Sequence, residues 1–194
     1  RRYSPLVRTM KGKLEQSDQP KSIIITVNAG QIAAEHWTQD PEIGGGRIVG
    51  EVCHFIDLAN HLVGKKCLKS YVIATEDPIA ANKLYDTVTI SLSFADGSTA
   101  SIHYFSNGHK SFPKERVEVF SNGKILNIDN FKVLEGWGWS NFRKKRLWRQ
   151  NKGQTEAVKE FFETTAASSI DEVNKLFEVS RLSIEINEQI RQRK

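Results

Sequence analysis

Cysteine is scarce in this chain of 194 residues, which contains only two, Cys53 and Cys67. Two cysteines are too few for a disulfide framework or for a zinc site with four cysteine ligands. Such sparing use of cysteine is typical of proteins that work in a reducing compartment. We therefore expect a cytoplasmic protein without disulfide bonds.

Long apolar runs are also missing. No stretch approaches the roughly 18 consecutive apolar residues that would indicate a membrane span, and the first five residues lack the apolar core of a signal peptide. The sequence does not begin with methionine, so we expect a fragment or a processed chain. Its length and its 39% of hydrophobic residues are typical of one globular domain.

The excess of positive charge is confined to one segment. Of the 28 basic residues, five lie within residues 143–149, and without these five the chain has 23 residues of each sign. Four aromatic residues lie in and around the segment: Trp137, Trp139, Phe142 and Trp148. Such interleaving can form a stacking surface for single-stranded nucleic acid. Because the rest of the chain is neutral, we favour aromatic residues packed on a sheet beside solvated cations, and no nucleic-acid partner.

Hydrophobic periodicity predicts four helices and a central run of strands. The helices are expected over residues 4–16, 48–63, 154–166 and 169–192, and a β-branched strand is expected over residues 21–27. In the last helix we expect an apolar stripe made of Val173, Leu176, Phe177, Ile184 and Ile190.

Two hairpins are predicted from the parity of their apolar positions. Residues 88–94 and 100–104 both have apolar residues at even positions, which a three-residue loop, Ala95-Asp96-Gly97, keeps on one face. Residues 117–128 change from odd to even positions, which suits a two-residue Asn122-Gly123 turn of type I′. The order of elements predicts an α+β domain, with an antiparallel sheet and helices packed on one of its faces.

The glycine-rich segment Gly44-Gly45-Gly46 does not fit a nucleotide-binding motif. A dinucleotide fingerprint would need a third glycine at Val49, and after Gly50 the Lys-Ser/Thr of a phosphate-binding loop is replaced by Glu51-Val52. We therefore expect no nucleotide binding by this chain alone.

The helix expected over residues 48–63 has a polar stripe, made of Glu51, His54, Asp57 and His61. The Glu-x-x-His spacing occurs in carboxylate-bridged metal bundles, but those need a second copy, and a zinc site would need a third ligand from elsewhere. We therefore assign no metal site. An acid–base pair is another interpretation, because a carboxylate one turn away orients an imidazole and raises its basicity. A solvated polar face is the third, and the spacing alone favours it.

Four stretches together resemble a known family: RRYSPLV, VNAG, HWTQDPEIGGGRIVGEVCHFIDL and FPKERVEVF. They are similar to the C-terminal domain of the Gfo/Idh/MocA family (glucose–fructose oxidoreductase / inositol dehydrogenase), whose members are NAD(P)-dependent sugar oxidoreductases. The resemblance extends over nearly the whole chain. It is most specific in the stretch GGGRxxGExCHFxDL.

The resemblance implies that residues 1–194 form a single C-terminal domain for substrate binding and oligomerisation, with an open, mostly antiparallel sheet. It implies an N-terminal Rossmann domain before Arg1 that holds NAD or NADP. Further implied partners are a sugar or sugar-nucleotide substrate and a second copy of the protein bound through the sheet. The lack of long apolar runs predicts no membrane partner.

Site residues follow from the same resemblance. The catalytic histidine of the family corresponds to His54, but the aspartate expected four residues earlier is Gly50 here. Glu51 can take its place, because side chains three and four residues earlier both face the histidine. The catalytic lysine of the family would lie before Arg1. Four residues are candidates for binding the sugar, the last of them suited to a carboxylate or phosphate: Asn28, His36, Trp37 and Arg47.

The implied reaction is hydride transfer between a sugar carbon and nicotinamide, with His54 taking or returning the hydroxyl proton. We expect the chain to be inactive without the nucleotide-binding domain. The alternative is a non-catalytic dimerisation or ligand-binding module, in which Glu51 and His54 are ordinary surface residues. A nucleic-acid-binding protein would instead show steep salt dependence of binding.

Overall fold

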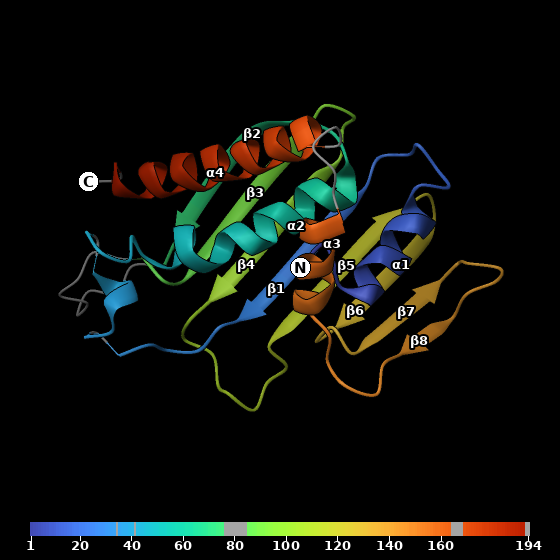
Figure 1. Cartoon of the computed structure of the whole chain (residues 1–194), viewed down its shortest axis with the longest axis horizontal. Coiled ribbons are helices and arrows are strands. Elements are labelled where there is room, and N and C mark those ends of the chain that lie inside the picture. Colours follow the sequence, from blue (N-terminus) through green and yellow to red (C-terminus); the bar gives the residue numbers. More distant parts are fainter. Residues whose placement is uncertain (34, 41, 76–84, 164–168, 193–194) are drawn as a thin grey trace.

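The fold consists of one sheet with helices on one of its faces (Figure 1). It is seen in a computed structural model that describes residues 1–33, 35–40, 42–75, 85–163 and 169–192. The predicted α+β class and the packing of the helices on a single face are both confirmed.

The sheet has eight strands in the order β2-β3-β4-β1-β5-β6-β7-β8. Their bounds are β1 (Ser22–Asn28), β2 (Cys67–Ala74), β3 (Val88–Phe94), β4 (Thr99–Phe105), β5 (Glu115–Ser121), β6 (Lys124–Asp129), β7 (Val133–Trp137) and β8 (Lys144–Arg146). Strand β1 lies in the middle, parallel to β4 and antiparallel to β5, and the other neighbouring strands are antiparallel. The sequence predicted strands at β1 and at β3 to β6 but gave no sign of β2, β7 or the parallel pair.

The two hairpins have the predicted turns. Gly97 has a φ of 82°, the left-handed conformation that a three-residue loop places at its last position. Asn122 and Gly123 have φ values of 49° and 69°, as a type I′ turn requires. Both turns therefore direct the apolar side chains of their strands toward the helices.

The helices are α1 (Pro5–Leu14), the short 3₁₀ turn η1 (Trp37–Gln39), the π-helical turn η2 (Ile48–Val52), α2 (Cys53–Val63), α3 (Gln154–Glu163) and α4 (Ser169–Arg191). Helix α2 continues directly from η2 and ends at Gly64, whose φ of 72° is typical of a helix C-cap. The predicted helix over residues 48–63 is thus confirmed, except that its first turn is wider than an α-helix.

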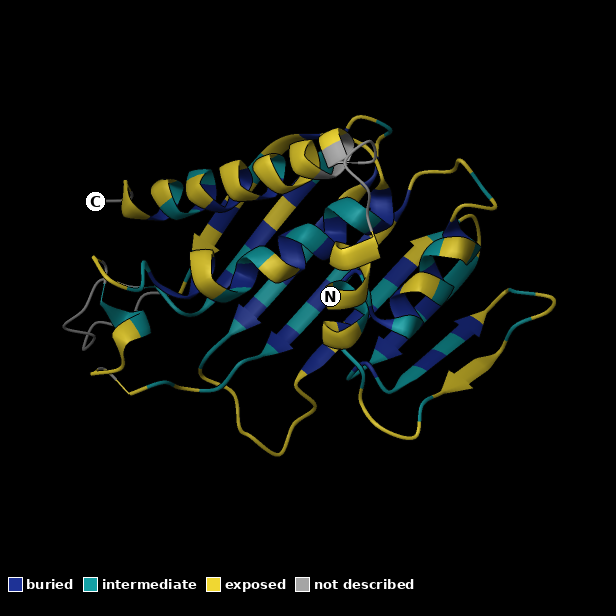
Figure 2. Ribbon diagram, in the orientation of Figure 1, coloured by how far each residue is buried: buried dark blue, intermediate teal, exposed yellow. Residues whose placement is uncertain are grey.

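The core lies between the sheet and helices α1 and α2 (Figure 2). Completely buried residues of this core include Met10 from α1, Leu58 and Leu62 from α2, and Ile25 and Ile102 from the sheet. Each such aliphatic side chain stabilises the fold by about 1.5–3 kcal/mol relative to an exposed position.

The predicted apolar stripe of the last helix is wrong. Val173, Leu176, Phe177 and Ile184 are exposed, and only Ile190 of that stripe is buried. Helix α4 instead packs with its second half on α2 and β2 and buries a different set: Val179, Leu182, Ile186 and Ile190. The helix has apolar residues on two faces, and the position of the sheet, which the helix sequence does not contain, selects the face that is buried.

Candidate functional site

A cluster of polar side chains lies at the start of the helix formed by η2 and α2. It joins this helix start to the ends of β1 and β4, two strands that are parallel neighbours and end at the same edge of the sheet. Arg47 precedes η2, Glu51 is part of η2, and Tyr104 comes from β4. The parallel pairing of β1 and β4 therefore builds the floor of the site.

Arg47 is held by the protein itself. Its side chain is almost completely buried, and one guanidinium nitrogen, Nη1, donates a hydrogen bond of 2.6 Å to the carbonyl oxygen of Gly30. The other, Nη2, lies 3.5 Å from Oε1 of Glu51, and the guanidinium carbon lies 5.0 Å from the centre of the Tyr104 ring. All of these partners belong to the fold, so Arg47 supports the site from beneath.

Glu51 connects this buried layer to the surface. Its Oε2 accepts a hydrogen bond of 2.7 Å from the hydroxyl of Tyr104, whose side chain is completely buried. Burial of Glu51 raises the pKa of its carboxyl, but the Tyr104 hydrogen bond and the Arg47 guanidinium outweigh burial and lower it. Burial and the same hydrogen bond raise the pKa of Tyr104 well above its usual range. Glu51 is therefore an anion and Tyr104 a neutral donor at neutral pH.

His54 lies one turn after Glu51 on the exposed side of α2. Among the described residues its ring makes no hydrogen bond. Partial burial and the Arg1 guanidinium lower the pKa of His54, whereas Asp57 and Glu51 act to raise it. A ring that is largely neutral at pH 7 and open to a ligand can accept a proton from a bound hydroxyl group.

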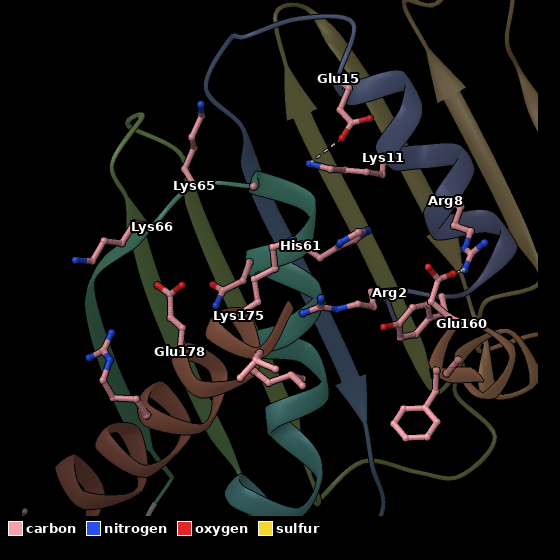
Figure 3. A pocket seen from close by; sticks show the side chains of 18 residues that line it. Arg2, Arg8, Lys11, Glu15, His61, Lys65, Lys66, Glu160, Lys175 and Glu178 are labelled. Atoms are coloured by element: carbon pink, nitrogen blue, oxygen red, sulfur yellow. Dashed lines mark hydrogen bonds and ion pairs between the residues drawn. The ribbon is translucent and has the colours of Figure 1, made fainter. Parts of the chain in front are cut away.

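The other two members of the predicted polar stripe have different surroundings. The Asp57 carboxylate is paired with Arg2, whose Nε lies 2.9 Å from Oδ2 and whose Nη2 binds Oδ1. His61 lines an open groove between α1, α3, α4 and the C-terminal end of α2 (Figure 3). The stripe thus divides into Glu51 and His54 at one end of the helix and His61 at the other.

Basic residues outnumber acidic residues in the lining of this groove, seven to three. An ion pair of 3.0 Å joins Arg8 to Glu160, and one of 3.4 Å joins Lys11 to Glu15 (Figure 3). His54 is not among the residues that line it. The groove is therefore a separate hollow from the cluster under Glu51.

The remaining predicted sugar-binding residues lie at the end of β1 and in the loop region that follows it. The amide of Asn28 donates hydrogen bonds to the carbonyl oxygens of His109 (2.8 Å) and Phe112 (3.3 Å), so it fastens the loop between β4 and β5. The His36 ring lies 2.9 Å, Nδ1 to Oγ1, from the Thr38 hydroxyl at the start of η1. Trp37 is 61% exposed. His36 and Trp37 are thus the two that face solvent.

The glycine-rich segment has a packing role. A Cβ atom on Gly44 would lie 2.4 Å from the carbonyl oxygen of Trp37, and Gly45 and Gly46 have φ values of 67° and 87°. These glycines let the chain fold back against η1 before it enters η2.

The basic segment contains one strand and two kinds of aromatic residue. Trp139 and Phe142 pack against the core, and the indole nitrogen of Trp139 donates a hydrogen bond of 3.1 Å to the carbonyl oxygen of Ile125. Trp137 and Trp148 are exposed. The expected packing of aromatic residues on the sheet is therefore confirmed for the first two and wrong for Trp137 and Trp148.

The sequence did not identify Tyr104, or the pair formed by Gln39 and Asp86, as residues of this region. Gln39 donates a hydrogen bond of 2.6 Å to Asp86, and burial raises the pKa of that carboxyl. Tyr104 continues the alternating apolar positions of its strand. This pattern predicted that its side chain faces the core, but not that its hydroxyl binds the Glu51 carboxylate. Within the described residues no group of three or more His, Cys, Asp or Glu side chains could hold a metal ion, and no helix is long and apolar enough to cross a membrane.

Together, these features define an α+β domain that presents an accessible imidazole one helical turn after a carboxylate that the fold holds in place. Residues 12–126 match the GFO/IDH/MocA C-terminal domain, so the chain belongs to that family of domains. A search of curated protein sequences gave no match.

Solved structures of sugar-converting enzymes have the same fold. A levoglucosan dehydrogenase in complex with NADH and levoglucosan is 19% identical, with a TM-score of 0.74 over 98% of this chain and 62% of its own. An aldose-aldose oxidoreductase from Caulobacter crescentus complexed with glycerol is 13% identical, with a TM-score of 0.74 over 100% of this chain and 60% of its own.

A third similar structure is the UDP-N-acetylglucosamine 3-dehydrogenase of Acidithiobacillus ferrooxidans, 12% identical, with a TM-score of 0.70 over 97% of this chain and 58% of its own. At these identities the likeness concerns the fold. The chain spans about 60% of the length of these relatives, which contain additional structure beyond this domain.

Proposed function

We propose that this domain binds the substrate of an NAD(P)-dependent sugar oxidoreductase and supplies its acid–base residue, His54. Two findings support the proposal: the family to which the chain belongs, and the accessible His54 ring beside a fixed carboxylate. The substrate is a sugar or a sugar nucleotide, as in the structural relatives.

In the oxidation direction His54 accepts the proton of a sugar hydroxyl while the carbon that bears it becomes a carbonyl carbon. Bound NAD or NADP supplies the hydride acceptor. In the reverse direction protonated His54 returns the proton to the new alkoxide. The Asp57 and Glu51 carboxylates make His54 a better base, because nearby negative charges favour the imidazolium. His36 and Trp37 are the proposed sugar contacts, whereas Asn28 and Arg47 hold the site from within.

The cofactor would be bound mainly by an N-terminal Rossmann domain of the same protein. The relatives are longer than the match, which supports this division. Without that domain, the chain is proposed to be inactive.

The sheet face opposite the helices is the proposed contact with a second copy. Tyr71 and Ile73 of β2 are exposed there, 62% and 64%, and no helix of the described residues covers that face. A non-catalytic dimerisation or ligand-binding module would use the same face but would not need His54.

The proposed role of His54 is tested by His54→Asn in the full-length protein. Turnover of the best substrate from a panel of sugars and sugar nucleotides, with NAD or NADP, should fall by roughly two to four orders of magnitude in kcat, while the circular-dichroism spectrum stays unchanged. His61→Asn is a matched control in the same helix and should keep normal kinetics.

Glu51→Gln should lower kcat less and move the limb of the pH profile that His54 governs to lower pH. Wild-type turnover in His54→Asn would contradict the catalytic role and favour the non-catalytic module.

A further inference from the structure

Two buried residues, Tyr104 and Arg47, contact the carboxylate of Glu51, yet the proposed reaction gives neither of them a role. An arginine buried to this degree and a tyrosine hydroxyl in the core are costly unless their polar groups find partners. Here the two terminal nitrogens of Arg47 and the Tyr104 hydroxyl find their partners in Gly30 after β1 and Glu51 in η2, whereas Nε of Arg47 is buried without a hydrogen-bond partner among the described residues. Such convergence under one accessible carboxylate requires an explanation beyond the packing of the core.

We propose that Tyr104 and Arg47 are positioning residues that fix the Glu51 carboxylate as an anion beside His54. The inference rests on the proposed function, because Glu51 matters for the reaction only if His54 is the acid–base residue. It adds to that function two residues that do not touch the substrate.

Each carboxylate oxygen has its own fixed neighbour. Oε2 accepts the hydrogen bond of 2.7 Å from Tyr104, and Oε1 lies 3.5 Å from the Arg47 guanidinium. Tyr104 cannot follow a moving side chain, because its ring is completely buried in the sheet, and Arg47 is tied to Gly30 by a hydrogen bond of 2.6 Å. Rotation of the Glu51 side chain would therefore break at least one of these contacts.

The location of the cluster supports a role in the site. Glu51 lies in a π-helical turn, and single π turns inside helices occur often at functional sites. The Glu51 side chain is 38% exposed, so its carboxylate is held by the buried Arg47 and Tyr104 on one side and is accessible from solvent on the other. Together with Asp57, whose effect is larger, the Glu51 carboxylate acts to raise the pKa of His54, and its share depends on its staying charged and near the ring.

The test uses Tyr104→Phe in the full-length protein, which removes only the hydroxyl group. With Glu51 less well fixed, kcat should fall about 10- to 100-fold with little change in KM, and the His54 limb of the pH profile should move to lower pH. Tyr3→Phe, the same substitution at a tyrosine that packs against Arg8 of α1 and lies outside this cluster, is the matched control and should leave both unchanged.

A double-mutant cycle separates positioning from general weakening of the core. In the Glu51→Gln background Tyr104→Phe should cost little further activity, because the group that it positions is already lost. An equal loss of kcat in both backgrounds would overturn the inference, as would normal kinetics of Tyr104→Phe.

A second readout does not depend on turnover. The carboxyl carbon of Glu51, followed by NMR, should titrate at higher pH in Tyr104→Phe than in the wild type, since the hydrogen bond favours the ionised form. An unchanged titration would overturn the positioning role even if His54→Asn is inactive. A shifted titration together with a fully active His54→Asn variant would instead leave the positioning intact and contradict the proposed function.

Discussion

Helices α2 and α3 lie on the same side of the sheet, yet they differ in what they bury (Figure 1). Helix α2 covers the sheet with a fully apolar face, and the turn before it closes over the buried Arg47 and Tyr104. Helix α3 buries none of its residues, and Phe161 and Phe162 are 77% and 80% exposed. The chain thus completes the surroundings of Glu51 with its own residues, whereas it leaves apolar side chains of α3 and of the first half of α4 open.

The two regions therefore differ in how far the domain's own residues support them. The carboxylate half of the proposed site should be formed whenever the domain is folded, because its supports lie in the sheet and in α2. The exposed apolar side chains of α3 and α4 have no such support among the described residues. The difference between the two regions can be tested in stability, in local opening and in pH dependence.

The largest expected effect concerns two leucines that differ in burial. Leu58→Ala in α2 removes a completely buried side chain and should lower the free energy of unfolding by about 2–5 kcal/mol. Leu176→Ala in α4, where the side chain is 58% exposed, is the matched control and should change it by less than about 0.5 kcal/mol. Urea denaturation of the chain measures both. A large loss in Leu176→Ala would show that the first half of α4 is packed in solution.

Local opening should distinguish the two helices with a smaller effect. Backbone amides of α3 should exchange with solvent roughly 100-fold faster than those of α2, because opening α3 exposes little buried apolar surface. Hydrogen exchange followed by mass spectrometry of peptides from each helix makes the comparison within one sample. Equal protection in α2 and α3 would mean that α3 is held by contacts other than those described.

The smallest expected effect is a pH dependence in the region of α2. The folded-state pKa of Glu51 lies below its ordinary value, so its stabilising contribution is present above pH 4.5 and is lost as pH falls through the lower folded value. The stability difference between wild type and Glu51→Gln should be on the order of 1 kcal/mol near neutrality, since the carboxylate is partly exposed, and should shrink toward pH 3. Denaturation at several pH values measures it. A difference that stays constant with pH would argue against an ionised, hydrogen-bonded Glu51.

Local patterns were sufficient for the hairpins and for the helix that contains His54. The turn at Gly97 and the turn at Asn122-Gly123 follow from the parity of neighbouring apolar positions, because strand side chains alternate with a period of two. The helix over residues 48–63 follows from its periodicity and from Gly64 at its end. Those features depend on residues within a few positions of one another.

Other features depend on residues that are far apart in the chain. Strand β8 is short and carries Lys144, Lys145 and Arg146, so nothing in its composition indicates a strand, and only pairing with β7 makes it one. The buried face of α4 was mispredicted because the helix has apolar residues on two sides. Tyr104 could be assigned to the correct face of β4, but its hydrogen bond to Glu51 crosses 53 positions of sequence.

The sequence by itself determined the α+β class, the two turns, the helix of His54 and, through resemblance, the family. Periodicity and turn chemistry are local, and short motifs persist where overall identity is low. Only the tertiary structure decided that β1 lies beside β4, that Arg47 is buried and that Glu51 has Tyr104 beneath it. The physical reason is that burial and hydrogen bonding in a low-dielectric interior depend on which distant residues meet, and the parallel pairing of β1 with β4 brings these together.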